Sequence, residues 1–479
     1  MTHEDHNSNS VRAWQAIVFS AMAGGMAWGI RGQYGHETGA MIAGLLVSLT
    51  LALLFCSGWR SLETARAVAW CTVAMGIGGT MTYGQTIGLT QNETFVGNWS
   101  AFRWGMLGLS IKGGLWIGFA GFFLGLGLGG VRYRPVELLL LLLGLVAVYF
   151  FGMYLLNSPF DPANERVPWI YFSEYRYWKP EGAIKPRQEY WGGCLLALAA
   201  ATAYAGWWRK DRLARHMAFW GVLGGALGFP GGQCIQAFHG WNPGFFRDGF
   251  FNFMNSNMNW WNWMETTFGM IMGATLGFGL WLNRKHIRPV EELDATPISP
   301  AVEWAILIVF TGALLAVEFK EYAWLEVILD LGIAMTVIPI AAVAGGRLWP
   351  YWMAFPLTLL PIAGKTVSVL AYGTPGMPVL VGWMAYGVLP MSLSIFAAFW
   401  FARQGRKDQD GVEFARRGLL LSVWTYYLLN FAFFGFPFPW SEWTARTPNN
   451  LVFTVCTIGL TLLALTRSRY RCVPETKST

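Results

Sequence analysis

Long apolar runs, each separated from the next by a shorter polar stretch, recur along the whole chain. One of them, residues 136–156, reads VELLLLLLGLVAVYFFGMYLL and contains a single charged residue. An apolar run of about 20 residues is long enough to cross a bilayer as an α-helix. The pattern therefore predicts an all-α, polytopic integral membrane bundle of about 14 transmembrane helices.

The predicted spans divide the chain into two transmembrane modules and two tails. The spans lie near residues 14–30, 38–56, 64–83, 105–130, 136–156, 189–208, 213–229, 264–283, 300–318, 322–345, 349–371, 376–401, 415–436 and 448–466. The modules are residues 14–290 and 291–466, and the tails are residues 1–13 and 467–479.

Composition agrees with a membrane protein and indicates its orientation. Charged residues make up 13% of the chain, about half the share in soluble domains. Lys and Arg concentrate in the loops after even-numbered spans, which predicts that both termini lie in the cytoplasm, with the chain in the inner membrane if the cell is bacterial. The excess of basic residues therefore requires no nucleic acid. We expect no metal and no cofactor, because the six cysteines are scattered and the sequence contains no nucleotide-binding or haem motif.

One local pattern occurs three times: a glycine, seven residues, then Gly-Gln. The copies are Gly24 to Gln33, Gly76 to Gln85 and Gly224 to Gln233. Each is followed by a Glu-Thr pair, at Glu37, Glu93 and Glu265, and then by a glycine-rich apolar run. Because each copy closes an odd-numbered span, we expect Gln33, Gln85 and Gln233 at the outer face.

These repeats favour a polar cavity. Glycines let membrane helices approach closely, and a broken helix is tolerated at membrane depth only inside protein or beside water. A Gln at such a break offers both a donor and an acceptor. Three similar corners would line an outward-facing polar pocket, arranged as parallel rather than inverted repeats. The alternative is that the glycines only pack helices and the Gln side chains cap helix ends.

Two predicted outer segments, residues 157–188 and 230–263, are long and rich in aromatic residues, Pro and Asn. Long loops in compact proteins are often functional. In the second segment, Asn259, Trp260 and Trp263 combine aromatic faces with an amide, which suits a polyhydroxylated ligand. The alternative is an aromatic belt at the membrane interface.

The predicted spans also contain ionisable residues, among them Lys112, Glu326, Asp330 and Lys365. Charges at membrane depth are costly and are usually functional or paired. We expect them to couple or gate transport, with Asp330 paired to Lys365 or to Lys112. A purely structural ion pair is the alternative.

Three functions remain open at this stage. The first is a permease for a small polar, sugar-like solute bound by Arg31, Gln33, Gln85, Gln233, His239, Asn259, Trp260 and Trp263. The second is an outer-face glycosyl or acyl transferase with a lipid-linked donor, in which the base is Glu37 or Glu265 and the acid/base partner is His36 or His239. The third is a membrane scaffold or binding subunit. The sequence leaves open whether the protein is an enzyme, and also its oligomeric state.

Overall fold

A computed structural model gives the structure of the chain. It describes residues 11–31, 39–81, 83–178, 185–290, 349–373, 377–408, 410–433 and 444–467, together with seven single positions between 301 and 316. The structural statements below concern these residues.

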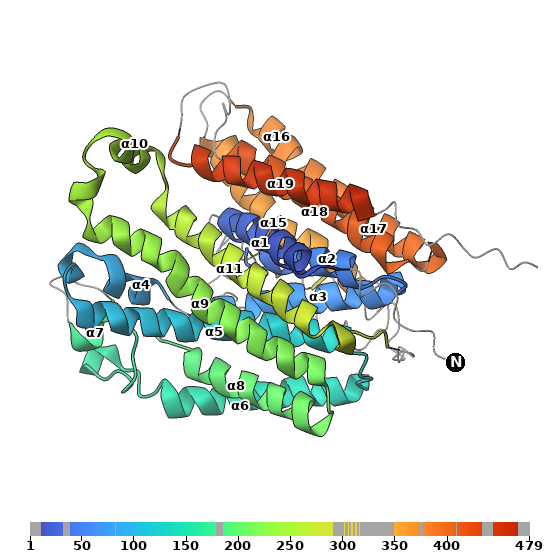
Figure 1. Ribbon diagram of the computed structural model, residues 1–479, viewed down its shortest axis with the longest axis horizontal. Coiled ribbons are helices and arrows are strands. Elements are labelled where there is room, and N and C mark those ends of the chain that lie inside the picture. Colours follow the sequence, from blue (N-terminus) through green and yellow to red (C-terminus); the bar gives the residue numbers. More distant parts are fainter. Residues whose placement is uncertain are drawn as a thin grey trace, which may run out of the picture.

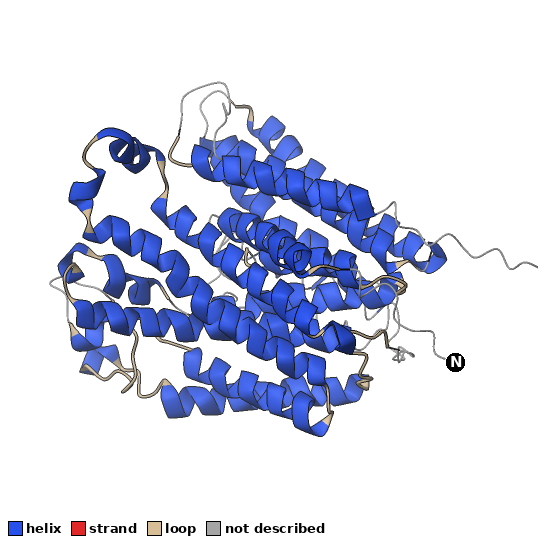
Figure 2. Ribbon diagram, viewed as in Figure 1, coloured by secondary structure: helices blue, strands red, loops and turns tan. Residues whose placement is uncertain are grey.

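The described chain is helical, and it contains no strand apart from two isolated β-bridges (Figure 2). The α-helices are α1 (Ala13–Arg31), α2 (Met41–Phe55), α3 (Ser61–Ile77), α4 (Gly84–Gln91), α5 (Trp99–Leu128), α6 (Pro135–Leu156), α7 (Glu174–Tyr177), α8 (Trp191–Ala203), α9 (Arg212–Trp241), α10 (Gly249–Asn257), α11 (Trp260–Leu282), α15 (Trp349–Gly373), α16 (Val379–Gly382), α17 (Leu389–Asp408), α18 (Gly411–Phe433) and α19 (Thr447–Arg467). Short π-helices join α8 to the following turn, at Tyr204–Trp208, and α16 to α17, at Trp383–Val388.

Three of the long helices start at a side-chain cap. Asn98, Asp211 and Asn259 each accept a hydrogen bond from the backbone amide three residues later, at the starts of α5, α9 and α11. Such a cap satisfies one of the amides that a helix start leaves unbonded. Asn259, which the sequence suggested as a ligand-binding residue, therefore has its side-chain oxygen engaged in capping α11.

Glycines allow the central helices to pack with their backbones in close approach. α5 packs along α9, and α1 packs along α11 (Figure 1). A Cβ on Gly225 would overlap the carbonyl of Gly113, and a Cβ on Gly269 would overlap the carbonyl of Gly24. Small residues at such crossings are the usual device of helices packed within a membrane.

The remaining helices flank this centre. α6 and α8 pack against each other on one side of the bundle, while α18 and α19 contact α1, α2 and α3 on the other. The short helices α4, α7 and α10 gather at one end of the molecule, and α1 begins toward the opposite end, beside the end of α11 (Figure 1). We call these the α10 end and the N-terminal end.

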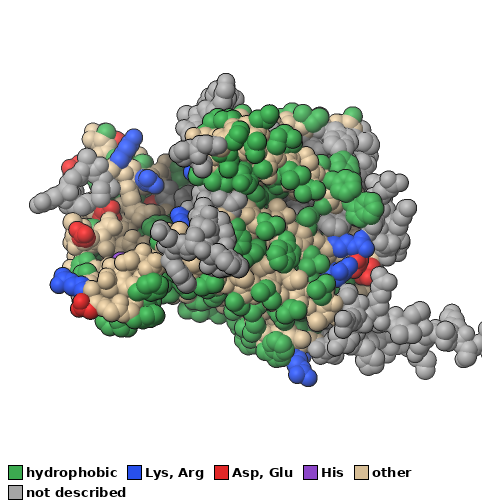
Figure 3. Space-filling view, turned by 90° about the horizontal axis from the view of Figure 1, so that it is seen from above, with side chains coloured by type: hydrophobic (Ala, Val, Ile, Leu, Met, Phe, Trp, Pro, Cys, Tyr) green, Lys and Arg blue, Asp and Glu red, His purple; other side chains and the backbone are tan. Residues whose placement is uncertain are grey.

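Four described helices are both long and apolar enough to cross a membrane: Trp99–Leu128, Val136–Leu156, Val379–Trp400 and Thr447–Thr466. The predicted bundle of 14 spans is not confirmed. α1, α9 and α11 have the length of a span, but the Gly and polar residues in their sequences lower their mean hydropathy. On the face shown in Figure 3, apolar side chains cover the middle of the molecule and charged side chains gather toward its two ends.

The structure corrects the prediction for the third repeat copy. The sequence predicted that a span ends near residue 229 and that residues 230–263 form a loop. Instead α9 continues through Pro230 and Gln233 to Trp241, and α10 and the start of α11 occupy much of the remainder. Gln233 is thus inside a helix, eight residues before its end, rather than at a corner.

Candidate functional site

The central feature of the described structure is a buried ion pair between helices α1 and α11. Arg31, the last residue of α1, places its Nη2 3.4 Å from Oε1 of Glu265, and the two side chains are only 3% and 2% exposed. A cation at a helix C-terminus is favoured by the helix dipole. Both residues were singled out from the sequence, but their pairing was not predicted.

Aromatic rings surround the guanidinium group of Arg31. Its Cζ lies 4.8 Å from the ring centroid of Trp28 and 5.4 Å from that of Trp116. Trp116 is fixed in place because its Nε1 donates to the Met75 carbonyl at 2.6 Å. Desolvated cation–π contacts of this kind contribute roughly 2 kcal/mol, so the rings hold the cation partly independently of Glu265.

The carboxylate of Glu265 likewise has neutral donors of its own. Trp261 Nε1 donates to Oε1 at 3.1 Å, and the Asn262 amide lies 3.5 Å from Oε2. Arg31 also donates to the hydroxyl of Tyr83 at 3.3 Å. We call Arg31, Tyr83, Asn262 and Glu265 the polar centre.

The polar centre contains unused hydrogen-bonding capacity. Asn262 donates to the Gly29 carbonyl at 2.6 Å, but among the described residues its own oxygen has no donor. The same holds for the oxygen of Asn449, a buried residue of α19 whose amide lies 3.3 Å from Thr266. Buried polar atoms are nearly always satisfied, so orphaned acceptors here need an explanation.

A second buried ion pair lies on α5. Lys112, the fourteenth of that helix's 30 residues, bonds to Glu189 and also donates to Thr86 Oγ1 at 2.7 Å. Glu189 in turn accepts from the Phe172 amide at 3.0 Å. Glu189 was not singled out from the sequence, although it is an acidic residue at the first position of the predicted span 189–208.

The two described Gln residues of the repeats both bond to protein near α4. Gln85 Nε2 donates to the Lys185 carbonyl at 2.7 Å, and its Oε1 accepts from Ser173 at 3.0 Å. Gln233 is fully buried and donates to Thr90 Oγ1 at 2.8 Å. They bond at opposite ends of α4, and the predicted polar cavity ringed by three corners is not confirmed. Gln233 Oε1 nevertheless has no donor among the described residues.

The aromatic segment near α10 forms a stacked cluster. His239 lies parallel to Trp260, with ring centroids 4.3 Å apart, and its Nε2 is 2.7 Å from Asn255 Oδ1. Within the described structure, the Nε1 atoms of Trp260 and Trp263 have no acceptor. The rings of this cluster are therefore stacked, while two of its indole N–H groups lack an acceptor. This combination fits either a ligand platform or an interfacial belt.

Several predicted residues fall elsewhere. Lys365 is exposed on α15. Gln33, His36, Glu37, Glu326 and Asp330 lie outside the described residues, so the pairing of Asp330 with Lys112 or Lys365 and the acid/base role of His36 and Glu37 stay predictions.

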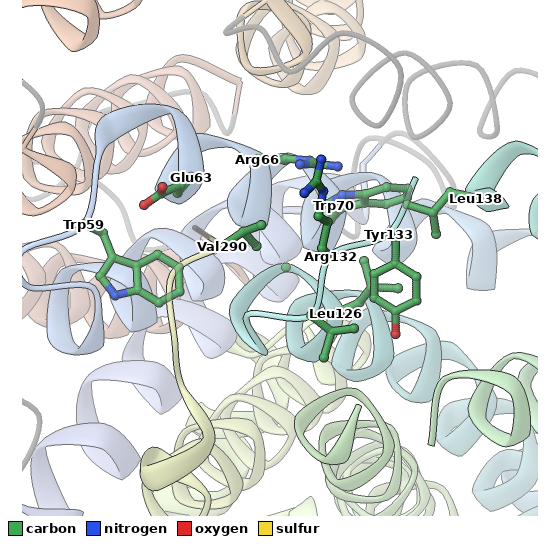
Figure 4. Close-up of a pocket in the computed structure, with 11 residues that line it drawn as sticks. Trp59, Glu63, Arg66, Trp70, Leu126, Arg132, Tyr133, Leu138 and Val290 are labelled. Atoms are coloured by element: carbon green, nitrogen blue, oxygen red, sulfur yellow. The ribbon is translucent and has the colours of Figure 1, made fainter. Parts of the chain in front are cut away.

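A pocket lies at the N-terminal end of the bundle, and none of the predicted site residues lines it. It is lined by Trp59, Glu63, Arg66, Trp70, Leu126, Gly127, Val131, Arg132, Tyr133, Leu138 and Val290 (Figure 4). Its interior has about 20 Å³ open to the centre of a water molecule, which is room for roughly one ordered water. The interior therefore does not hold a solute of several heavy atoms.

The chain was compared with protein-family models, curated proteins and solved structures, and nothing in any of the three matches it.

Proposed function

We propose that this chain is a multi-pass membrane permease for a small polar solute, and that the polar centre forms part of the solute site. The long apolar helices, the apolar middle of the surface and the basic loops support the membrane location. In this proposal the N-terminal end, where the basic loops lie, faces the cytoplasm.

The observation that carries the proposal is the buried Arg31–Glu265 pair inside a glycine-packed helical core. Replacing such a pair by apolar side chains is often neutral or stabilising, so stability alone gives little reason to keep it. Ionisable groups among membrane helices instead mark solute or ion pathways by default.

The geometry of the pair fits a functional role better than a structural one. A structural Arg–carboxylate bridge is expected to be bidentate, with N–O distances near 2.8 Å. Here Nη2 of Arg31 lies 3.4 Å from Oε1 of Glu265. Each partner also has a favourable contact of its own, Arg31 with two indole rings and Glu265 with the Trp261 N–H, so each group keeps part of its stabilisation when the pair opens.

The unsatisfied atoms indicate what kind of solute fits. Asn262 Oδ1, Asn449 Oδ1 and Gln233 Oε1 are all buried acceptors without a donor among the described residues. A solute that brings several O–H or N–H groups would satisfy them, and each satisfied acceptor removes a desolvation cost of about 1–3 kcal/mol. A sugar or polyol meets this requirement.

Ligand-induced stabilisation of the purified protein tests the proposal. Sugars, polyols, amino acids and lipid-linked sugars are added in turn, and the unfolding temperature is followed. A ligand at 100 times its Kd stabilises the folded state by about 2.7 kcal/mol. We expect one soluble solute to do so, and the same solute to cross the bilayer of proteoliposomes that contain the protein.

Variants connect this response to the site. Gln233→Ala and Asn449→Ala should lose the ligand response, whereas the exposed Asn252→Ala on α10 should keep it. Asn449→Ala removes only one weak described bond, so it separates lost binding from lost folding. Retention of the full response in both site variants would contradict the assignment, and a response to lipid-linked sugar alone would favour the outer-face transferase instead.

A further inference from the structure

Helix α4 turns three hydroxyl groups towards the bundle. Tyr83, immediately before the helix, and Thr86 and Thr90 within it are 5%, 1% and 0% exposed. Their spacing of three and four residues puts them on one face of a helix. Another side of α4 faces the surface, where Gln85 is exposed and no described atom lies within 4 Å of a Cβ built on Gly84.

Each of these hydroxyl groups accepts a hydrogen bond from a polar side chain of a different long helix, α1, α5 or α9. The bonds run from Arg31 to Tyr83 at 3.3 Å, from Lys112 to Thr86 at 2.7 Å and from Gln233 to Thr90 at 2.8 Å. The hydroxyl groups of Thr86 and Thr90 themselves donate to the backbone carbonyls of Phe172 and Ile87, so towards the long helices their oxygens act as acceptors. We call Arg31, Lys112 and Gln233 the three donors.

The three donors belong to one layer of the bundle. One helical turn further from the α10 end, the same helices carry the buried rings of Trp28, Trp116 and Phe229. Trp28 packs against Trp116 with ring centroids 5.1 Å apart, and Tyr83 lies 5.9 Å from Trp116 and 5.3 Å from Phe229. The rings therefore close this layer on one side, and α4 covers it from the α10 end (Figure 1).

We propose that α4 is a plug of the solute site: its three hydroxyl groups stand in for hydroxyl groups of a sugar or polyol, and the solute displaces it. This inference rests on the solute site proposed above. The site offers two complementary sets of groups, the three donors now held by α4 and buried acceptors without a donor, such as Asn262 Oδ1 and Gln233 Oε1. A hydroxyl group donates and accepts at once, so a polyhydroxylated solute matches both sets.

The chain on both sides of α4 is interrupted, which allows the helix to move. A 3-10 turn, Gly78–Thr80, follows the end of α3 and separates it from α4. Beyond α4, Gly97 has a φ of +85°, and no described atom lies within 4 Å of a Cβ built on it. Discontinuous membrane helices are where many transporters bind their solutes. The ion pairs of Arg31 with Glu265 and of Lys112 with Glu189 do not involve α4, so both cations keep a counter-charge when the plug leaves.

The affinity of α4 variants for neutral sugars tests the plug. Weakening the closed state raises the fraction of protein that is competent to bind, and the apparent affinity rises with it. Isothermal titration calorimetry of the full-length protein in detergent uses D-glucose, sucrose and D-mannitol as probes. Thr90→Val removes the acceptor of Gln233 and should tighten binding about fivefold, which corresponds to about 1 kcal/mol for one hydrogen bond. Thr86→Val should change the affinity in the same direction.

Thr72→Val is the matched control. Thr72 is fully buried in α3 and donates to the Val68 carbonyl of its own helix, so its replacement should leave the affinity unchanged. Equal or weaker binding in Thr90→Val and Thr86→Val would overturn the plug and leave the permease standing. A gain in Thr72→Val as large as that in the α4 variants would also overturn the plug, because loosened packing would then be the cause. If neither the wild type nor any variant binds a probe, the permease proposal fails and the plug fails with it.

Hydrogen exchange of the wild type gives a second measurement that needs no variant. A bound probe that displaces α4 should make the amides of residues 84–91 exchange faster than in the protein without the probe. Slower exchange of these amides would show that the solute binds against α4 in its present place, which would overturn the plug.

Discussion

The second and third repeat copies share one motif and have different structures. In the second copy the chain breaks after α3, and Gln85 lies in the first turn of the separate short helix α4. In the third copy α9 runs without interruption through Gln233. The Glu-Thr pairs differ in the same way: Glu93 is exposed in a 3-10 turn, whereas Glu265 is buried against Arg31.

The difference shows that the motif does not fix its own environment. The equivalent glycines illustrate this: nothing lies within 4 Å of a Cβ built on Gly84, whereas a Cβ on Gly232 would overlap the Met264 carbonyl. α9 packs along α11, and Gly232 lies at that contact, whereas no described atom lies close to a Cβ on Gly84 of α4. The neighbouring helix, rather than the motif, therefore determines which copy is buried.

The largest predicted effect comes from removing the buried carboxylate. Glu265→Ala leaves Arg31 without its buried counter-charge, and losing one partner of such a pair costs about 3–5 kcal/mol. Glu93→Ala, the same change in the other copy, should stay within about 0.5 kcal/mol, as surface substitutions usually do. Denaturant unfolding measures both, and equal losses would show that the two copies do not differ as described.

A double variant separates the pair from its surroundings. Arg31→Met combined with Glu265→Leu replaces both charges by apolar groups and should recover most of the loss of Glu265→Ala. Additive losses in the double-mutant cycle would mean that the two residues act independently.

A smaller effect is expected at the equivalent glycines. Gly232→Ala introduces a methyl group into a closed crossing between α9 and α11, and such overpacking costs about 1–3 kcal/mol. Gly84→Ala adds the same methyl group in open space at the start of α4 and should be neutral or slightly stabilising. Thermal unfolding of the two variants side by side gives the comparison, and a larger loss for Gly84→Ala would contradict it.

The smallest predicted effect is a pH dependence of the stability of the folded state, which comes from Glu174 beside α4. Glu174 in α7 is buried, its Oε2 has no donor among the described residues, and a Cβ added to Gly88 of α4 would lie 2.8 Å from that atom. Burial raises its pKa from 4.5 to about 7. Because the folded state holds this proton more tightly, the stabilising contribution is full below pH 4.5 and is lost as the pH rises through 7.

Thermal unfolding between pH 5 and pH 8 measures this effect. The melting temperature of the wild type should fall relative to that of Glu174→Gln over this range, because the amide stays uncharged. Glu93→Gln serves as the exposed control and should follow the wild type. A constant difference between wild type and Glu174→Gln at all pH values would show that Glu174 does not titrate there.

Sequence patterning predicted the helices better than it predicted their ends. The apolar runs near 136–156 and 38–56 correspond closely to α6 and α2. The end of α9 was missed because Pro230 and three glycines nearby resemble a helix stop. A proline is tolerated there because neighbouring helices pack around the backbone that it interrupts.

The sequence alone determined that this chain is helical, apolar and rich in close-packing glycines, because those properties follow from local residue patterns. It also identified Arg31, Lys112, Gln233 and Glu265 as unusual, since each is a polar residue within or beside an apolar run. Only the tertiary structure decided which of them meet. Arg31 and Glu265 are 234 residues apart and Lys112 and Glu189 are 77 apart. The packing of α1 on α11, and of α8 and the residues before it on α5, brings each pair together, and no local pattern encodes that separation.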